Sequence, residues 1–203
     1  MSTRPRTHRS ASALQRRAAV LRAATEIAGE EGVGAATHRS IAARAGVPPA
    51  TTSYFFPSLT DLMAEALRTF VSERSAEFEA VAQMAERDPD AVVAAFAHSL
   101  LGGDRTSELA QIEAYLHSAR GEELRPAVAE VITSFERVAK TVLRSLGARR
   151  AAEGARAFVA LSDGFTLQHL ANPRADDEEV LIDALRSLFS AYATDRNDWP
   201  EVG

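Results

Sequence analysis

Residues 37–62 read THRSIAARAGVPPATTSYFFPSLTDL, and this stretch decides the fold of the N-terminal part of the chain. Thr37 is a good N-cap for a short helix that Ile41 and Ala45 anchor to a core and that Gly46 stops. Pro48 and Pro49 fit only at the entry of a second short helix, and Pro57 closes it after Phe55. Two short helices around a glycine turn predict a DNA-binding helix-turn-helix.

The sequence on both sides of this stretch is helical in pattern. Leu14, Ala18, Leu21 and Ala24 recur at spacings of three and four, and Gly29, Gly32 and Gly34 are expected to end that helix. Residues 1–13 have little to bury, and we expect a disordered basic arm there. Residues 14–60 are predicted to form the DNA-binding domain.

Residues 61–203 are predicted to form a second helical domain. Ser58 with Asp61 predicts the start of a long helix to about Arg87, and Thr106 is expected to cap a later one. Further helices are expected over residues 88–101, 124–146, 149–171 and 176–193. No strand-like alternation occurs, so the fold class is all-α, with about nine helices.

Charge is divided unevenly along the 203 residues. The net charge is −5, but residues 1–56 hold eight arginines against three glutamates, and the remainder holds 15 basic and 25 acidic groups. A basic head on an acidic body concentrates the attraction for phosphate at one end. An arginine-rich solvated tail is the plainer alternative.

Other classes of protein are disfavoured. No apolar run approaches a membrane span, cysteine is absent, and a cytoplasmic location is expected. No nucleophile–base pair, phosphate loop or metal spacing stands out, so we expect no enzyme, no cofactor and no metal site.

Specific residues resemble the TetR family of bacterial transcription regulators: Thr37, Ile41-Ala42, Ala45-Gly46-Val47, Thr51, Tyr54, Phe56-Pro57-Ser58 and Leu62. Leu161 to Gln168 also resembles an Asp-Gly stretch that many relatives carry in their penultimate helix. The resemblance implies a three-helix head, a long fourth helix, and a body that binds a small-molecule effector and dimerises. Where the family often has Ser, a polar residue, His and Lys, this chain has Pro48, Pro49, Phe55 and Leu59.

The function predicted is a sequence-specific repressor that a small molecule releases from a palindromic double-stranded DNA operator. Because the departures from the family pattern remove polar groups, an interaction module with weakened DNA affinity is the alternative, and an all-helical enzyme is a further one. The residues expected to contact DNA lie in or beside the helix-turn-helix: Thr37, Arg39, Arg44, Pro49, Ala50, Thr51, Thr52, Ser53 and Tyr54. For Arg44 a surface salt bridge is an equal alternative, and Arg39 is the best candidate for a bidentate guanine contact.

Two further sets belong to the predicted body. An effector pocket would combine aromatic and single polar groups, namely Phe70, Phe96, His98, Tyr115, His117, Phe135, Phe165, Gln168 and His169. A homodimer contact would use apolar residues of the last two helices, namely Phe158, Leu161, Phe165, Leu181, Leu185, Leu188 and Phe189. An intrachain core is the alternative for both sets.

Overall fold

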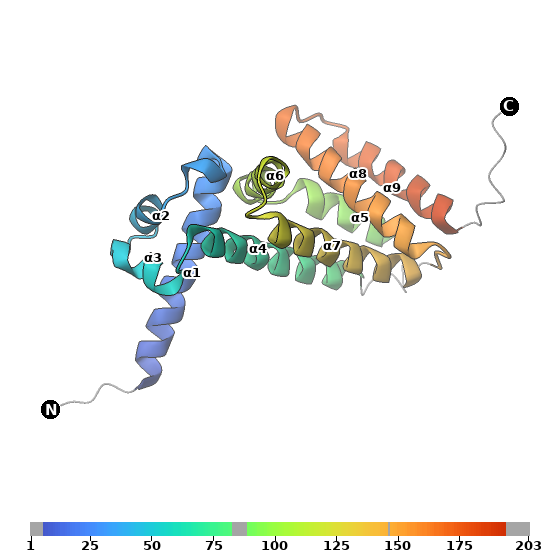
Figure 1. Cartoon of the computed structure of the whole chain (residues 1–203). Coiled ribbons are helices and arrows are strands. Elements are labelled where there is room, and N and C mark those ends of the chain that lie inside the picture. The colour runs from blue at the N-terminus through green and yellow to red at the C-terminus, as the bar shows by residue number, and fades with distance from the viewer. Residues whose placement is uncertain (1–5, 83–88, 146, 194–203) are drawn as a thin grey trace. The chain divides into compact units, whose positions relative to one another are not determined.

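The structure is a computed structural model that describes residues 6–82, 89–145 and 147–193. The described residues contain nine α-helices and one short 3₁₀-helix, and no strand, which confirms the predicted all-α class (Figure 1). The helices are, in chain order, α1 (Arg6–Glu31), η1 (Val33–Ala35), α2 (His38–Arg44), α3 (Pro49–Phe55), α4 (Leu59–Ala82), α5 (Pro89–Leu101), α6 (Arg105–Arg120), α7 (Arg125–Ser145), α8 (Ala151–Ala171) and α9 (Asp177–Ala193). None of the described helices is both long and apolar enough to cross a bilayer.

The chain divides into two compact units, and the division differs from the boundary expected after residue 60. The first unit comprises the described residues of 1–70 and 104–129, and the second those of 71–103 and 130–203. Helix α6 therefore packs with the N-terminal helices, because tertiary contacts and not chain order define a compact unit.

Helix α1 begins earlier than expected. It starts at Arg6, so the prediction of a disordered arm is wrong for residues 6–13, whereas residues 1–5 lie outside the described residues. Arginine, serine and alanine are tolerated in a helix, and none of residues 6–13 is a proline that would break one. A low content of apolar residues therefore did not prevent helix formation.

The end of α1 also differs from the prediction. Gly29 lies inside the helix, and Gly32, with φ of 87°, follows its last residue. A methyl group on Gly29 would lie 2.0 Å from the backbone oxygen of Thr106 in α6. Gly29 is therefore a place where α6 approaches the backbone of α1, and not a helix terminator.

Helix caps agree with the sequence at two of three positions. Thr37 caps α2, where its Oγ1 accepts a hydrogen bond of 3.0 Å from Ser40 N. Ser58 caps α4 by accepting a 3.0 Å hydrogen bond from Asp61 N. Thr106 is not the cap of α6, because Asp104 accepts from Ser107 N at 2.9 Å instead.

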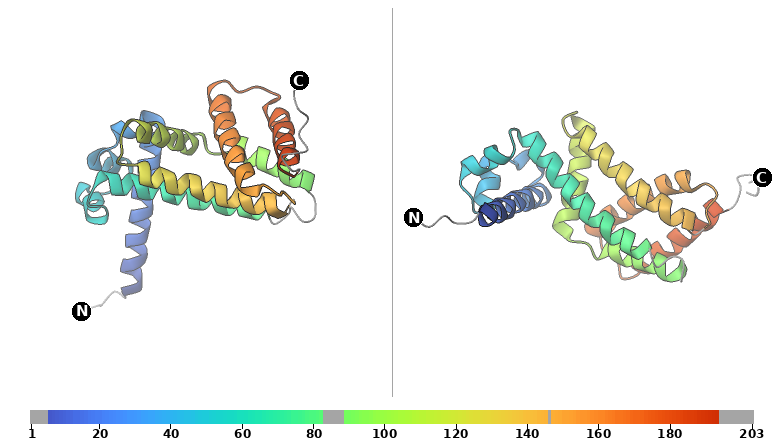
Figure 2. Two further views of the ribbon diagram at one scale, coloured as in Figure 1. Left: turned by 45° about the vertical axis from the view of Figure 1, so that its right-hand side comes forward. Right: turned by 90° about the horizontal axis from the view of Figure 1, so that it is seen from below.

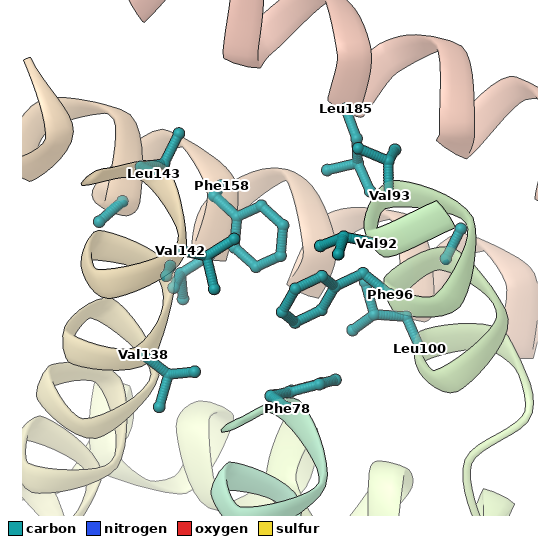
Figure 3. Close-up of a cluster of buried hydrophobic side chains, with 14 of the residues drawn as sticks. Phe78, Val92, Val93, Phe96, Leu100, Val138, Val142, Leu143, Phe158 and Leu185 are labelled. Carbon is teal, nitrogen blue, oxygen red and sulfur yellow. The ribbon is translucent and has the colours of Figure 1, made fainter. Parts of the chain in front are cut away.

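The second unit is built around an apolar core contributed by five helices. Phe78 from α4 packs against Phe96 from α5 with ring centroids 5.2 Å apart, and Phe96 packs against Phe158 from α8 at 5.6 Å. Figure 3 shows these rings between the valines of α7 and of α5, with Leu185 of α9 nearby. Aromatic pairs of this kind contribute about 0.5–1.5 kcal/mol beyond their buried area.

Helices α8 and α9 lie side by side as a hairpin (Figure 2), and both contribute residues to this core. His169 Nδ1 lies 2.6 Å from Asp177 Oδ2, and Arg174 N donates to the same oxygen at 2.9 Å. The hydrogen bond from the Arg174 backbone, followed by that from His169, lowers the pKa of Asp177. The ionised carboxylate thus fixes the connection between the two helices.

Candidate functional site

The turn between α2 and α3 sets up the helix-turn-helix in the first unit. Gly46 has φ of 64°, a backbone conformation that favours glycine, and its N–H bonds to Ala43 O. Pro49 is the first residue of α3, where its missing N–H costs nothing. Figure 1 shows α2 and α3 packed beside α1, as the sequence predicted.

One side of α3 faces solvent. Pro49, Ala50, Ser53 and Tyr54 are exposed, and Thr51 is half-buried. Tyr54 is 82% exposed, the highest value among the exposed large hydrophobic side chains of the described residues. An exposed aromatic residue on a short helix, among small side chains, is available to a partner that the single chain does not contain.

The start of α2 carries an exposed cation. Arg39, the second residue of α2, is exposed and forms no hydrogen bond or ion pair with any other described residue. Thr37 is exposed as well, but its hydroxyl is engaged with Ser40. Arg39 is therefore the group on this helix that can bind a phosphate or a base edge.

The prediction for Thr52 is wrong. Its side chain is 0% exposed, so it cannot reach a base edge or a phosphate. Thr51, Thr52 and Ser53 are three consecutive residues with hydroxyl groups. The packing of α3 on its neighbours, and not the sequence, determines which of these hydroxyl groups is buried.

For Arg44 the salt-bridge alternative is the correct one. Its guanidinium lies 2.8 Å from Glu30, 3.2 Å from Glu31 and 3.6 Å from Glu26, all on α1. The hydrogen bond with Glu30 is the main reason that the pKa of Arg44 is raised. Arg44 thus links α2 to α1 through its ion pairs.

Arg17 has a similar structural role that the sequence did not reveal. Its Nη2 lies 2.9 Å from Glu65 Oε1 on α4, and its guanidinium carbon lies 5.1 Å from the centre of the Phe56 ring. Phe56 itself is buried, as expected for the residue that fixes the end of α3. No spacing rule connects positions 17, 56 and 65, so only the tertiary structure brings them together.

The predicted effector residues are divided between the two units. Phe70, Tyr115 and His117 belong to the first unit, and the other six belong to the second. Phe70 lines a cavity of about 20 Å³ together with Met63, Leu67, Gln111 and other side chains of α1, α4 and α6. That volume holds about one water molecule and no effector of ordinary size.

In the second unit the predicted effector residues divide between core and surface. Phe96 is buried, and Phe135 and Phe165 pack against the same core. Gln168 is exposed, and the side chain of His98 is 79% exposed beside Glu178. His98 and Gln168 are therefore wrong as residues of an interior pocket, and His169 is engaged with Asp177.

The predicted dimer residues divide in the same way. Phe158, Leu181 and Leu185 are buried within the chain itself, so they are core residues and the dimer prediction is wrong for them. Leu161, Phe165, Leu188 and Phe189 are only partly buried. Leu167 and Val180, which the prediction did not include, are 47% and 48% exposed on α8 and α9.

Comparisons with known proteins agree with this geometry. Residues 20–66 match a family model described as "Bacterial regulatory proteins, tetR family", and residues 86–191 match one described as "Tetracyclin repressor-like, C-terminal domain". No curated protein matches the chain.

Three solved structures illustrate the likeness. A member of the TetR family from Streptomyces coelicolor is 36% identical, with 85% of this chain and 97% of that chain covered and a TM-score of 0.69. The multidrug binding protein EbrR complexed with ethidium is 36% identical, covering 85% and 98%, with a TM-score of 0.62. EbrR complexed with malachite green is 34% identical, covering 85% and 96%, with a TM-score of 0.66.

The match of both family models, together with these identities over most of both chains, favours neither the interaction module nor the enzyme considered above. An N-terminal helix-turn-helix and a C-terminal helical region of the same family occur in one chain, in the order that the family has. The chain belongs to the TetR family, and it is a DNA-binding transcriptional regulator with a ligand-binding C-terminal domain.

Proposed function

We propose that this regulator is a repressor that binds a palindromic operator as a homodimer, in the cytoplasm, and leaves it when a small molecule binds the C-terminal domain. The observation that carries the DNA-binding part is the solvent-facing side of α3, which includes Tyr54, together with Arg39 of α2, an exposed cation that no other described residue pairs with. In a helix-turn-helix the second helix enters the major groove and the first crosses the backbone.

The roles of individual groups follow from their chemistry. Pro49, Ala50 and the methyl group of Thr51 would contact thymine methyl groups, and the hydroxyl of Ser53 would bond to a base edge or a phosphate. Tyr54 would donate its hydroxyl to a phosphate near the end of α3, and Thr37 would approach the backbone at the start of α2. Thr52 is buried and is left out of this contact, and Arg44 is assigned to its ion pairs with α1.

A dimer is needed because one short helix makes too few contacts for specific recognition. The partly buried residues Leu161, Phe165, Leu188 and Phe189, with the exposed Leu167 and Val180, supply apolar surface on α8 and α9 for a second copy. Two heads then bind two half-sites of an operator with matching twofold symmetry.

Binding to the DNA upstream of the protein's own gene tests the DNA-binding part. We expect operator affinity to fall steeply as salt rises, because each neutralised phosphate releases a counterion. Fluorescence anisotropy with the upstream fragment and a scrambled fragment of equal length gives the affinity and its salt slope. Equal affinity for both fragments at physiological salt would contradict sequence-specific recognition.

Replacing Tyr54 with phenylalanine should weaken binding to every operator variant by the same factor, about two- to tenfold, because a hydroxyl–phosphate bond carries no sequence information. The ring remains, so its edge contact with Phe55, at a centroid distance of 5.4 Å, is kept. Anisotropy on a panel of single-base operator variants measures this. Affinity equal to that of the wild type would remove Tyr54 from the interface.

We further propose that the effector is an aromatic cation, since EbrR is a relative whose complexes hold ethidium and malachite green. Phe78 already holds a cation on its face, because the guanidinium carbon of Arg74 lies 4.8 Å from its ring centre.

The effector proposal predicts saturable binding of malachite green to the protein alone, with a micromolar Kd. The titration omits DNA because cationic dyes bind DNA themselves. A neutral triarylmethane of similar size is the matched ligand control and should bind less tightly. A titration up to about a hundred micromolar protein detects a binding free energy of about −5.5 kcal/mol or stronger. If the dye fluorescence stays unchanged over that range, an aromatic cation is not the effector.

A further inference from the structure

The side chain of Thr52 carries an inference beyond the DNA contacts proposed above. Thr52 lies in the middle of α3, yet it is 0% exposed whereas Tyr54, two residues later, is 82% exposed. A hydroxyl group in such a position costs free energy unless it is hydrogen-bonded. The partners of this hydroxyl therefore matter.

Thr52 Oγ1 has two carbonyl acceptors. It donates to Pro49 O at 2.9 Å, one turn earlier in α3, and to His38 O at 3.3 Å, in α2. A threonine hydroxyl has one hydrogen, so the two carbonyls share it. The bond to Pro49 is a local bond within a helix, but the bond to His38 joins two helices.

Each of the two acceptor carbonyls belongs to the first residue of a helix. Pro49 is the first residue of α3, and His38 is the first residue of α2, directly before Arg39. The hydroxyl thus ties together the starts of the two helices that present Arg39 and the exposed side of α3. Base readout by paired hydrogen bonds depends on that relative placement.

Stability alone does not explain the hydroxyl. Valine has nearly the shape of threonine and would fill the same space without a polar group to satisfy. His38 O and Pro49 O both remain acceptors for the backbone N–H groups four residues later in their own helices. Removing the hydroxyl would therefore leave neither carbonyl without a partner.

We propose that Thr52 is a positioning residue: its buried hydroxyl sets the placement of α3 against the start of α2, and through it the specificity of DNA binding. The proposal rests on the proposed docking of α3 in the major groove. It assigns Thr52 a function although Thr52 touches no DNA.

Two substitutions in the full chain separate positioning from packing. Thr52→Val keeps the shape and removes the hydroxyl, so the melting temperature should stay the same or rise. The ratio of operator affinity to non-specific affinity should fall about three- to tenfold, in proportion to one lost hydrogen bond. Non-specific affinity and its salt slope should not change, because the phosphate-binding groups are intact.

Thr52→Ser is the matched control, because it keeps the hydroxyl and removes the methyl group. Its melting temperature should fall, since a buried methyl group is lost, while the affinity ratio stays near the wild-type value. Thr52→Val should thus lose specificity and keep its stability, whereas Thr52→Ser should lose stability and keep its specificity.

A measurement on the protein without DNA tests the role of Thr52 even if α3 does not dock in the major groove as proposed. Hydrogen–deuterium exchange of the backbone amides of residues 50–56 should be several-fold faster in Thr52→Val and unchanged in Thr52→Ser when both are corrected for global stability. Unchanged exchange in Thr52→Val, or affinity ratios that follow the melting temperature in both variants, would overturn the proposal. If the wild type itself prefers no operator, the docking fails, and the exchange measurement alone decides the role of Thr52.

Discussion

Gly29→Ala is expected to lower the free energy of unfolding by about 1–3 kcal/mol, the range of overpacked sites. The reason is the backbone of α6: the added Cβ would lie 2.0 Å from Thr106 O, 2.9 Å from Thr106 C and 3.0 Å from Thr106 Cγ2. A backbone carbonyl cannot rotate away as a flexible side chain can, so α6 must move away from α1.

Helix propensity acts in the opposite direction. Alanine is favoured over glycine inside a helix by about 1 kcal/mol, and Gly29 is helical. Contacts as short as 2.0 Å do not occur between real atoms of this kind, so the steric term should exceed the propensity term. Chemical denaturation measures the net effect.

Gly164→Ala in α8 is the matched control. Gly164 is also inside a helix, but a Cβ there would meet no atom within 4 Å in the described chain. Only the helix propensity of alanine then acts, so the free energy of unfolding should stay equal or rise by up to about 1 kcal/mol. A Gly29→Ala variant as stable as Gly164→Ala would mean that α1 and α6 do not approach as closely as the structure has them.

Arg39→Ala should have the largest effect on DNA binding of any single substitution in the head. A bidentate contact to guanine contributes about 1–3 kcal/mol of discrimination, which corresponds to about five- to 150-fold per head. Arg39 is suited to this contact because it is exposed and makes no ion pair with another described residue. It therefore loses no internal partner when it binds DNA.

The same variant shows which kind of contact Arg39 makes. Loss of a guanine contact should relax the preference at one base position, whereas loss of a phosphate contact should weaken all sequences equally and reduce the salt slope by about one. Anisotropy on single-base operator variants at three salt concentrations distinguishes the two results.

Arg137→Ala is the matched control for charge. Arg137 is exposed on α7 in the second unit, and its removal changes the net charge by the same amount. Operator affinity should stay within about twofold of the wild type, because Arg137 lies outside the helix-turn-helix and exposed charges are screened at physiological salt. If Arg39→Ala and Arg137→Ala behave alike, the contribution of Arg39 is only that of net charge.

Much of the fold could be predicted because its signals are local. Gly46 marks the turn, Pro48 and Pro49 mark the entry of α3, and Thr37 and Ser58 cap the helices that follow them. Backbone conformation and capping depend on residues a few positions apart, so a single sequence contains the whole interaction. The two short helices of the helix-turn-helix follow from these local signals.

The sequence alone therefore determined the all-helical class, the helix-turn-helix and the exposed group around Tyr54. The tertiary structure decided which neighbouring residues act: it buried Thr52 but not Ser53, paired Arg44 with three carboxylates of α1, and placed Gly29 against α6. It also turned Leu181 and Leu185 inward. These outcomes depend on partners distant in the sequence, because burial and ion pairing are properties of packed surfaces and not of a residue's own segment.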